Sequence, residues 1–211
     1  MKFTGIRMFQ RFSLVLLMLA VAPVWAELNL NYGIANKHVR RGILQSGQDV
    51  IVQGGVDYHA PLGLYAGAWT YTGNFENNNY FELNTYAGIG FNIGPLAIGT
   101  GYIRYEFDGN RDPFSEYNMN LGMGSYRISG YWDEDETYRY FEGAANYQFW
   151  EKSGFVFTLG HKDDNNHNQT WNYSTAFVMA MPDDVDLEVK LTREDNKGNG
   201  LVIGVTKQLS F

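Results

Sequence analysis

Residues 187–191 read Leu-Glu-Val-Lys-Leu, so apolar side chains alternate with charged ones. The same alternation runs through 28–34 (Leu-Asn-Leu-Asn-Tyr-Gly-Ile) and 117–121 (Tyr-Asn-Met-Asn-Leu). Because successive side chains of a strand point to opposite faces, this pattern predicts β-strands with one apolar and one polar face. No apolar set with helical spacing continues over three turns, so we expect an all-β chain.

The breaks between strands are of two alternating kinds. Tight breaks such as Gly94-Pro95 and Gly124-Ser125 alternate with longer polar breaks such as 74–79 and 163–170. Short turns at one end and longer loops at the other are typical of membrane barrels. We therefore predict a closed antiparallel up-and-down transmembrane β-barrel over residues 27–211. Its expected strands, about twelve, lie near residues 28–41, 49–60, 63–73, 80–93, 95–107, 115–124, 126–133, 138–150, 154–162, 171–181, 185–194 and 200–211.

The first 26 residues have the pattern of a secretory signal peptide. Lys2, Arg7 and Arg11 precede a short apolar run at 12–22, and a small residue, Ala26, ends the segment. The run is too short to span about 30 Å of hydrocarbon, which argues against a transmembrane anchor. The sequence thus predicts export through the periplasm of a Gram-negative cell, and the strand pattern predicts the outer membrane as the destination.

The composition excludes several classes of protein. The 211 residues include 16 basic and 23 acidic side chains, and this balance argues against a nucleic-acid partner. The chain has no cysteine, which removes disulfides, thiol catalysis and cysteine-bound metals. The mean hydropathy of -0.32 argues against a helical membrane protein. A soluble lipocalin-like barrel is the competing fold, but it requires eight strands and an apolar interior, whereas these strands alternate apolar with polar residues.

Isolated charges on the polar strand faces are the candidate pore-lining residues. A cation-selective lumen is expected, because acids outnumber bases in this set and more acids lie in the long breaks. Arg104 beside Glu82 or Glu106 forms either a constriction or an ion pair that braces the barrel. The candidate set is Asp57, Glu82, Arg104, Glu106, Arg127, Glu142, Glu188 and Lys190. The adjacent pair Arg40-Arg41 is expected to end the first strand beside a loop.

The sequence offers little for catalysis or metal binding. Its histidines lie in no His-Glu-x-x-His motif, and the segments 161–167 and 133–136 are best interpreted as solvated loops. A barrel hydrolase would need a Ser–His pair oriented by a third group, for which Ser46 with His38 and Ser174 with His161 are the candidates. We expect no enzyme, no catalytic residue, no metal and no cofactor.

A resemblance to a known family starts at residues 53–58, Gln-Gly-Gly-Val-Asp-Tyr. It continues at 63–69 (Gly-Leu-Tyr-Ala-Gly-Ala-Trp), at Tyr86-Ala87-Gly88 and at 101–105 (Gly-Tyr-Ile-Arg-Tyr). These motifs resemble TorF-type porins, which are proteobacterial outer-membrane proteins of largely unassigned function. The resemblance is specific over about residues 40–107 and implies an outer-membrane barrel with a pore. The terminal Phe211 resembles the signature that the barrel-assembly machinery reads.

These observations favour a porin-like channel for passive diffusion of small polar solutes or cations. A barrel of eight strands is filled by its own side chains, whereas one of 16–18 strands leaves an aqueous channel, so a barrel of about twelve is intermediate. The alternatives are a plugged structural or adhesive barrel and an outer-membrane barrel hydrolase. The expected partners are outer-membrane lipid, lipopolysaccharide and the barrel-assembly machinery.

Overall fold

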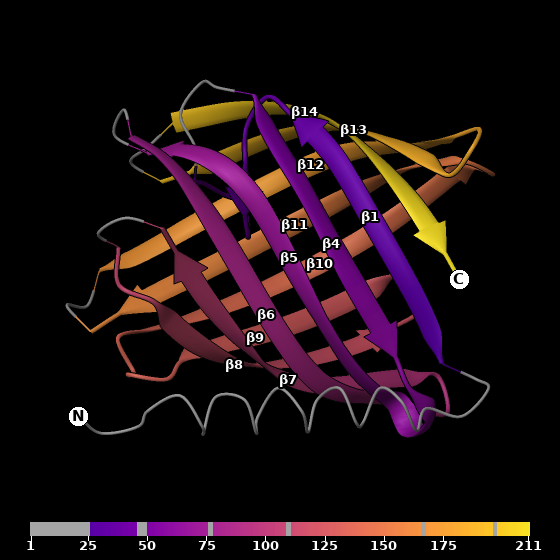
Figure 1. Cartoon of the computed structure of the whole chain (residues 1–211), viewed down its shortest axis with the longest axis horizontal. Helices are drawn as coiled ribbons and strands as arrows, with labels where there is room; N and C mark the ends of the chain where they lie inside the picture. Colours follow the sequence, from indigo (N-terminus) through magenta and orange to yellow (C-terminus); the bar gives the residue numbers. More distant parts are fainter. Residues whose placement is uncertain (1–25, 46–49, 76–77, 109–110, 166–167, 196–197) are drawn as a thin grey trace, which may run out of the picture.

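Twelve long antiparallel strands close into one barrel (Figure 1). The structure is a computed structural model and describes residues 26–45, 50–75, 78–108, 111–165, 168–195 and 198–211. The strands are β1 (Glu27–Ala35), β4 (Ile51–His59), β5 (Leu64–Phe75), β6 (Asn78–Ile93), β7 (Leu96–Phe107), β8 (Phe114–Met123), β9 (Tyr126–Asp133), β10 (Tyr138–Trp150), β11 (Ser153–Asp164), β12 (Gln169–Met181), β13 (Val185–Glu194) and β14 (Gly198–Ser210). The prediction of a closed antiparallel barrel with about twelve strands is confirmed. The predicted signal peptide lies outside the described residues, apart from Ala26.

Each strand pairs with its neighbours in the sequence, and β1 closes the barrel against β14. The closing pair continues to the chain end, where Leu28 and Phe211 exchange backbone hydrogen bonds of 3.3 and 2.9 Å. No helix in the described part of the chain is long and apolar enough to cross a membrane.

The pairing register assigns each strand residue to the inner or the outer face, because directly paired residues point the same way. Tyr71 pairs with Glu82 and Glu82 with Phe107, so these three share the inner face. The large exposed apolar side chains belong to the outer set. They include Ile34, Val52, Ile89, Ile128, Phe157, Leu159, Leu191 and Ile203. This apolar outer wall around a polar interior is the arrangement expected of a barrel in lipid.

The two ends of the barrel differ in their connections. One end has tight turns, two of which use glycine in the left-handed region: Gly94 with φ 58° and Gly124 with φ 57°. A short 3-10 turn, η1 (Pro61–Gly63), joins β4 to β5 at the same end. The other end carries the longer connections. We call them the tight-turn end and the long-loop end.

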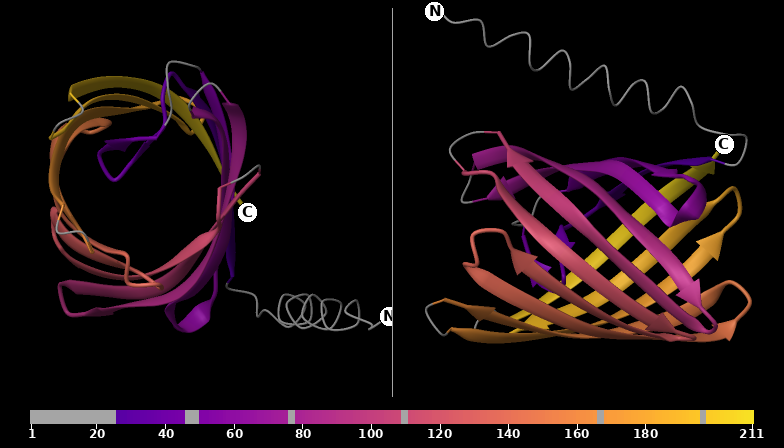
Figure 2. Two further views of the ribbon diagram at one scale, coloured as in Figure 1. Left: turned by 90° about the vertical axis from the view of Figure 1, so that its left-hand side faces the viewer. Right: turned by 90° about the horizontal axis from the view of Figure 1, so that it is seen from below.

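The first connection departs from the prediction. The first strand was expected to continue to residue 41, but β1 ends at Ala35. The chain then forms a two-stranded hairpin, β2 (Val39–Arg40) and β3 (Ile43–Leu44), which is not part of the barrel sheet. Its two-residue turn, Arg41-Gly42, has φ angles of 53° and 75°, as a type I′ turn requires. The hairpin projects into the interior of the barrel (Figure 2).

Candidate functional site

A buried ion pair fixes the tip of the hairpin to the barrel wall. The guanidinium of Arg41 donates two hydrogen bonds to Glu116 on β8, one of them 2.7 Å long, and a third of 3.0 Å to the Tyr105 hydroxyl. The same guanidinium lies 3.6 Å from the centre of the Tyr131 ring. Burial works to lower the pKa of Arg41, but the hydrogen bond to Glu116 and the charge interactions with Tyr105, Glu116 and Tyr131 together outweigh it, so the pKa is raised. Arg41 therefore stays charged inside the lumen.

A second ion pair holds the first strand of the hairpin. The Arg40 guanidinium lies 3.4 Å from a carboxylate oxygen of Glu82 on β6. Glu82 is completely buried and also accepts a hydrogen bond from the Tyr71 hydroxyl. Arg40 lies over the ring of Phe114, 5.4 Å from its centre. Both arginines of the hairpin are thus paired with carboxylates of the wall.

The opposite side of the hairpin contacts the far wall. The Gly42 carbonyl accepts a hydrogen bond from the Thr192 hydroxyl, and the Tyr140 hydroxyl donates to the Arg41 carbonyl at 2.7 Å. A Cβ placed on Gly42 would lie 2.4 Å from the Asn172 Oδ1, so a larger residue would have to displace this amide, and the φ of 75° independently favours glycine. The hairpin therefore contacts β6 to β10 as well as β12 and β13, so its contacts reach across the lumen.

His38 lies at the base of the hairpin. Its ring stacks on Tyr71 with 3.7 Å between ring centres. Burial, with the nearby positive charges of Arg40 and Lys190, lowers the pKa of His38 to about 3. The imidazole is neutral at ordinary pH, and its protonation opposes the docked position of the hairpin.

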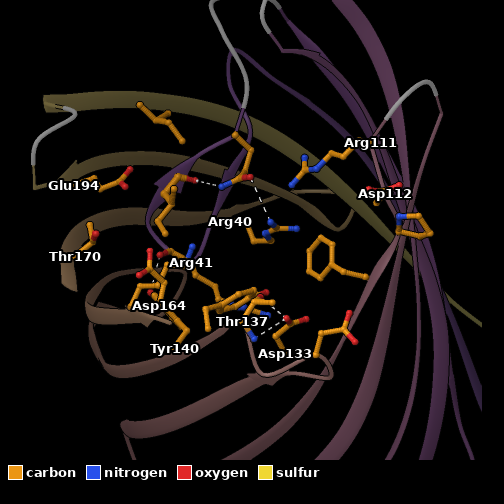
Figure 3. A pocket seen from close by; sticks show the side chains of 18 of the residues that line it. Arg40, Arg41, Arg111, Asp112, Asp133, Thr137, Tyr140, Asp164, Thr170 and Glu194 are labelled. Carbon is orange, nitrogen blue, oxygen red and sulfur yellow. Dashed lines mark hydrogen bonds between the residues drawn. The ribbon is translucent and has the colours of Figure 1, made fainter. Parts of the chain in front are cut away.

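Two cavities lie on either side of the hairpin. The vestibule, about 690 Å³, lies toward the long-loop end and has the hairpin residues Arg40, Arg41, Ile43 and Leu44 as its floor (Figure 3). Its walls come from the ends of β8 to β13. Their polar or charged lining residues include Asp133, Thr137, Lys162, Asp164, Thr170 and Glu194.

The chamber, about 440 Å³, lies on the other side of the hairpin, toward the tight-turn end. Lys37, His38 and Val39 bound it on the hairpin side. Asp186, Glu188, Lys190, Thr206 and Gln208 line its wall on β13 and β14. Both cavities are bounded by charged and hydroxyl-bearing side chains, which suits them to water and polar solutes.

Six of the eight predicted pore-lining residues face the lumen. Asp57 accepts hydrogen bonds from Asn31, at 3.2 Å, and from the Tyr86 hydroxyl, and Glu82 holds Arg40. The remaining four form two ion pairs within the lumen: Arg127 with Glu142 at 3.5 Å, and Lys190 with Glu188 at 2.8 Å.

The assignment of Arg104 and Glu106 to the lumen was wrong. Arg104 pairs with Thr85 and Ser115, on the outer face, and lies 3.9 Å from Glu106 beside it. Their neighbours Tyr105 and Phe107 take the inner positions. Both charged residues lie near the long-loop end of β7, away from the middle of the apolar band. A charged side chain on the outer face destabilises a barrel little at this depth, because it is close to the membrane interface. Arg104 therefore neither forms a constriction nor reaches Glu82.

Arg40-Arg41 is the feature of the site that the sequence reasoning misplaced. The pair was expected to end a strand, whereas it lies inside the lumen, beside the long-loop ends of β6 and β8. One local signal was present in the sequence, since a glycine at the second position of a two-residue turn, here Arg41-Gly42, is compatible with a hairpin. Its inward docking depends on Glu82 and Glu116, which lie 42 and 75 residues away.

Among the described residues, the candidates for other chemistry do not come together. Ser174 pairs with Thr158 on the inner face, whereas His161 faces outward against Trp171, 4.4 Å between ring centres. Ser46 and His167 lie outside the described residues. Within the part of the chain that the structure describes, no three His, Asp or Glu side chains are grouped to hold a metal ion.

A family model described as "Bacterial protein of unknown function (Gcw_chp)" matches residues 20–174. The chain belongs to the Gcw_chp family. No curated protein matches this Gcw_chp sequence at the significance required.

Solved structures similar to this Gcw_chp chain are outer-membrane barrels. A KdgM porin in complex with disordered oligogalacturonate has a TM-score of 0.61 at 7% identity, covering 86% of this chain and 98% of its own. The NanC porin has a TM-score of 0.58 at 10% identity, covering 86% and 100%. An outer-membrane channel from Pseudomonas putida F1 has a TM-score of 0.53 at 11% identity, covering 90% and 97%. At these identities the likeness is one of fold.

Proposed function

We propose that this chain is an outer-membrane channel for small polar solutes in which the β2–β3 hairpin is the constriction. One observation carries the proposal: an apolar outer wall surrounds a polar lumen, with cavities of about 690 and 440 Å³ on the two sides of the hairpin. Cavities of this size leave room for water, whereas a barrel that is filled by its own side chains does not. The tight-turn end then faces the periplasm and the long-loop end faces the outside.

The lumen charges favour cations. Arg40 and Arg41 are neutralised by Glu82 and Glu116, so they add no positive field to the passage. Acids outnumber the remaining bases along the vestibule wall, and a focused negative potential concentrates cations. The oligogalacturonate in the similar KdgM structure is a polyanion. The acidic vestibule of this chain is unsuited to such a solute, and small cations or neutral polar solutes fit it better.

The motifs at residues 53–58 and 63–69 support assignment to the TorF-type porins. In that setting the outer wall contacts lipid and lipopolysaccharide, and β14 with the terminal Phe211 contacts the barrel-assembly machinery. Phe211 supports this role because its ring is exposed on the outer face at the tight-turn end.

A plugged barrel is the second candidate, because the docked hairpin crosses the lumen and is held on both sides. Conductance separates the two. Purified protein in a planar bilayer is expected to give discrete current steps. Under a salt gradient, the sign of the reversal potential is expected to show that cations permeate more easily than anions. A sign that shows preference for anions would contradict the charge argument. A folded barrel with no current at any voltage would establish the plugged alternative.

A further inference from the structure

Acidic side chains outnumber basic ones among the described residues that line the vestibule. Once Arg40 and Arg41 are assigned to their wall carboxylates, two bases remain among these described residues, Arg111 and Lys162. The acids among its described lining residues are Asp112, Asp133, Asp135, Asp164, Glu194 and Asp195. A cation that enters from the long-loop end therefore meets this excess before it reaches the hairpin (Figure 3).

One of these acids has an unfilled acceptor. Asp133 is only 5% exposed, and its Oδ2 accepts hydrogen bonds from the backbone N–H of Thr137, at 3.2 Å, and from the Thr137 hydroxyl. Its Oδ1 accepts none from the described residues. This oxygen has almost no exposed surface, so an N–H donor in the vestibule reaches it only when the Asp133 side chain turns toward the cavity. The hydrogen bond made there offsets the cost of a buried carboxylate oxygen without a donor.

Aromatic rings in and beside the vestibule already contact cations of the protein. The ammonium of Lys162 lies 4.7 Å from the centre of the ring of Tyr138, which lines the vestibule. The Arg111 guanidinium lies 4.0 Å from the centre of the Phe107 ring, and Phe107 stacks on the lining residue Phe114 with 5.9 Å between ring centres. Ring faces attract cations, and they also pack against the carbon chain that bears one.

A bare metal ion does not fit these observations, because the described carboxylates do not converge on one point. An organic cation does fit them. We propose that the vestibule binds solutes that carry ammonium groups on a short carbon body, with Asp133 accepting a hydrogen bond from the ammonium and Phe114 packing against the carbons. The volume of about 690 Å³ lies within the usual range for small-molecule sites. The solute class rests on the proposed channel function, whereas the binding site does not.

The test compares 1,4-diaminobutane with 1,4-butanediol, which has the same carbon chain without charge. Titration calorimetry of the detergent-solubilised barrel measures binding without conduction, and planar-bilayer recording measures block of the current. We expect the diamine to bind at least tenfold more tightly than the diol. We expect Asp133→Asn to lower the affinity for the diamine by about tenfold, because a hydrogen bond to a charged group is lost.

Asp183→Asn is the matched control. It removes the same charge at the tight-turn end, in a turn with φ 62°, which asparagine tolerates, and is expected to leave binding unchanged. Phe114→Leu keeps every charge and is expected to lower the affinity for the diamine several-fold. This variant tests the site even if Asp133→Asn does not fold. Equal binding of diamine and diol, or equal effects of Asp133→Asn and Asp183→Asn, would overturn the proposal. Calorimetric binding in a barrel that passes no current would support the site and contradict the channel.

Discussion

Glu116→Gln is the sharpest perturbation of the constriction. Glu116 is completely buried and is the carboxylate partner of Arg41. Glutamine keeps the size of the side chain but removes its charge. Its amide NH2 group cannot accept a hydrogen bond from the Arg41 guanidinium, so one of the two acceptor oxygens is lost. The arginine is left charged and unpaired, unless the hairpin leaves the lumen and returns it to water.

The expected effect is large because the pair is buried. Removing one partner of a buried ion pair costs about 3–5 kcal/mol. The hairpin belongs to a separate two-stranded sheet, so it can undock without breaking any barrel pairing. A loss of about 3 kcal/mol lowers the ratio of docked to undocked hairpin by roughly a hundredfold. The barrel itself is expected to remain folded.

Single-channel recording in a planar bilayer measures the result. We expect Glu116→Gln to show larger or more frequent conductance steps than the unmodified chain. Glu106→Gln is the control, since it makes the same chemical change on the outer face, where Glu106 lies 3.9 Å from Arg104. Unchanged conductance in a folded Glu116→Gln barrel would refute the idea that this ion pair holds the constriction.

The docked hairpin can also be locked. The chain has no cysteine, and a Leu44 methyl carbon lies 2.8 Å from the position that a Cβ on Gly200 would take. A disulfide between Leu44→Cys and Gly200→Cys, added to Glu116→Gln, is expected to restore the small conductance. A reducing agent is expected to reverse this restoration.

Three further changes have defined outcomes. Gly42→Ala places a Cβ 2.4 Å from the Asn172 Oδ1 at φ 75°, so conductance is expected to rise while the far-UV circular dichroism of the barrel is retained. The pKa of His38 falls from 6.5 to about 3 on docking, so docking is fully stabilised above pH 6.5 and weakens as pH falls toward 3. Conductance is therefore expected to rise on acidification, less steeply in His38→Gln. Phe157→Arg on the outer face is expected to cost about 2–4 kcal/mol in urea unfolding from lipid vesicles, unlike Thr158→Arg on the inner face.

Much of the fold could be predicted from the sequence because it depends on local alternation. In stretches such as 187–191 the alternation of apolar and charged side chains can be read directly. Tight breaks such as Gly94-Pro95 show where the chain changes direction between strands. The register then follows from neighbouring strands joined by short turns, and the observed β9, β10 and β13 have the predicted bounds. A period-two pattern with an apolar outer face therefore determined the barrel by itself.

Alternation did not determine which face each charge takes near the end of a strand. Residues 102–107 read Tyr-Ile-Arg-Tyr-Glu-Phe, with bulky side chains on both faces. The rule that polar residues face the lumen sends Arg104 and Glu106 inward, but Tyr105 is required inside, where it contacts Arg41 and Glu116. The rule holds only where lipid covers the outer face.

The constriction was decided by the tertiary structure alone. Nothing near Arg40 or Arg41 in the sequence marks them as lumen residues, because their partners Glu82 and Glu116 lie on β6 and β8. Closure of the barrel brings those carboxylates to the same level of the lumen and buries them there. Two buried negative charges need two positive ones, and the only described loop that supplies them is the hairpin between β1 and β4. Local periodicity thus sets the wall of the barrel, and burial of charge across the closed sheet sets what lies inside it.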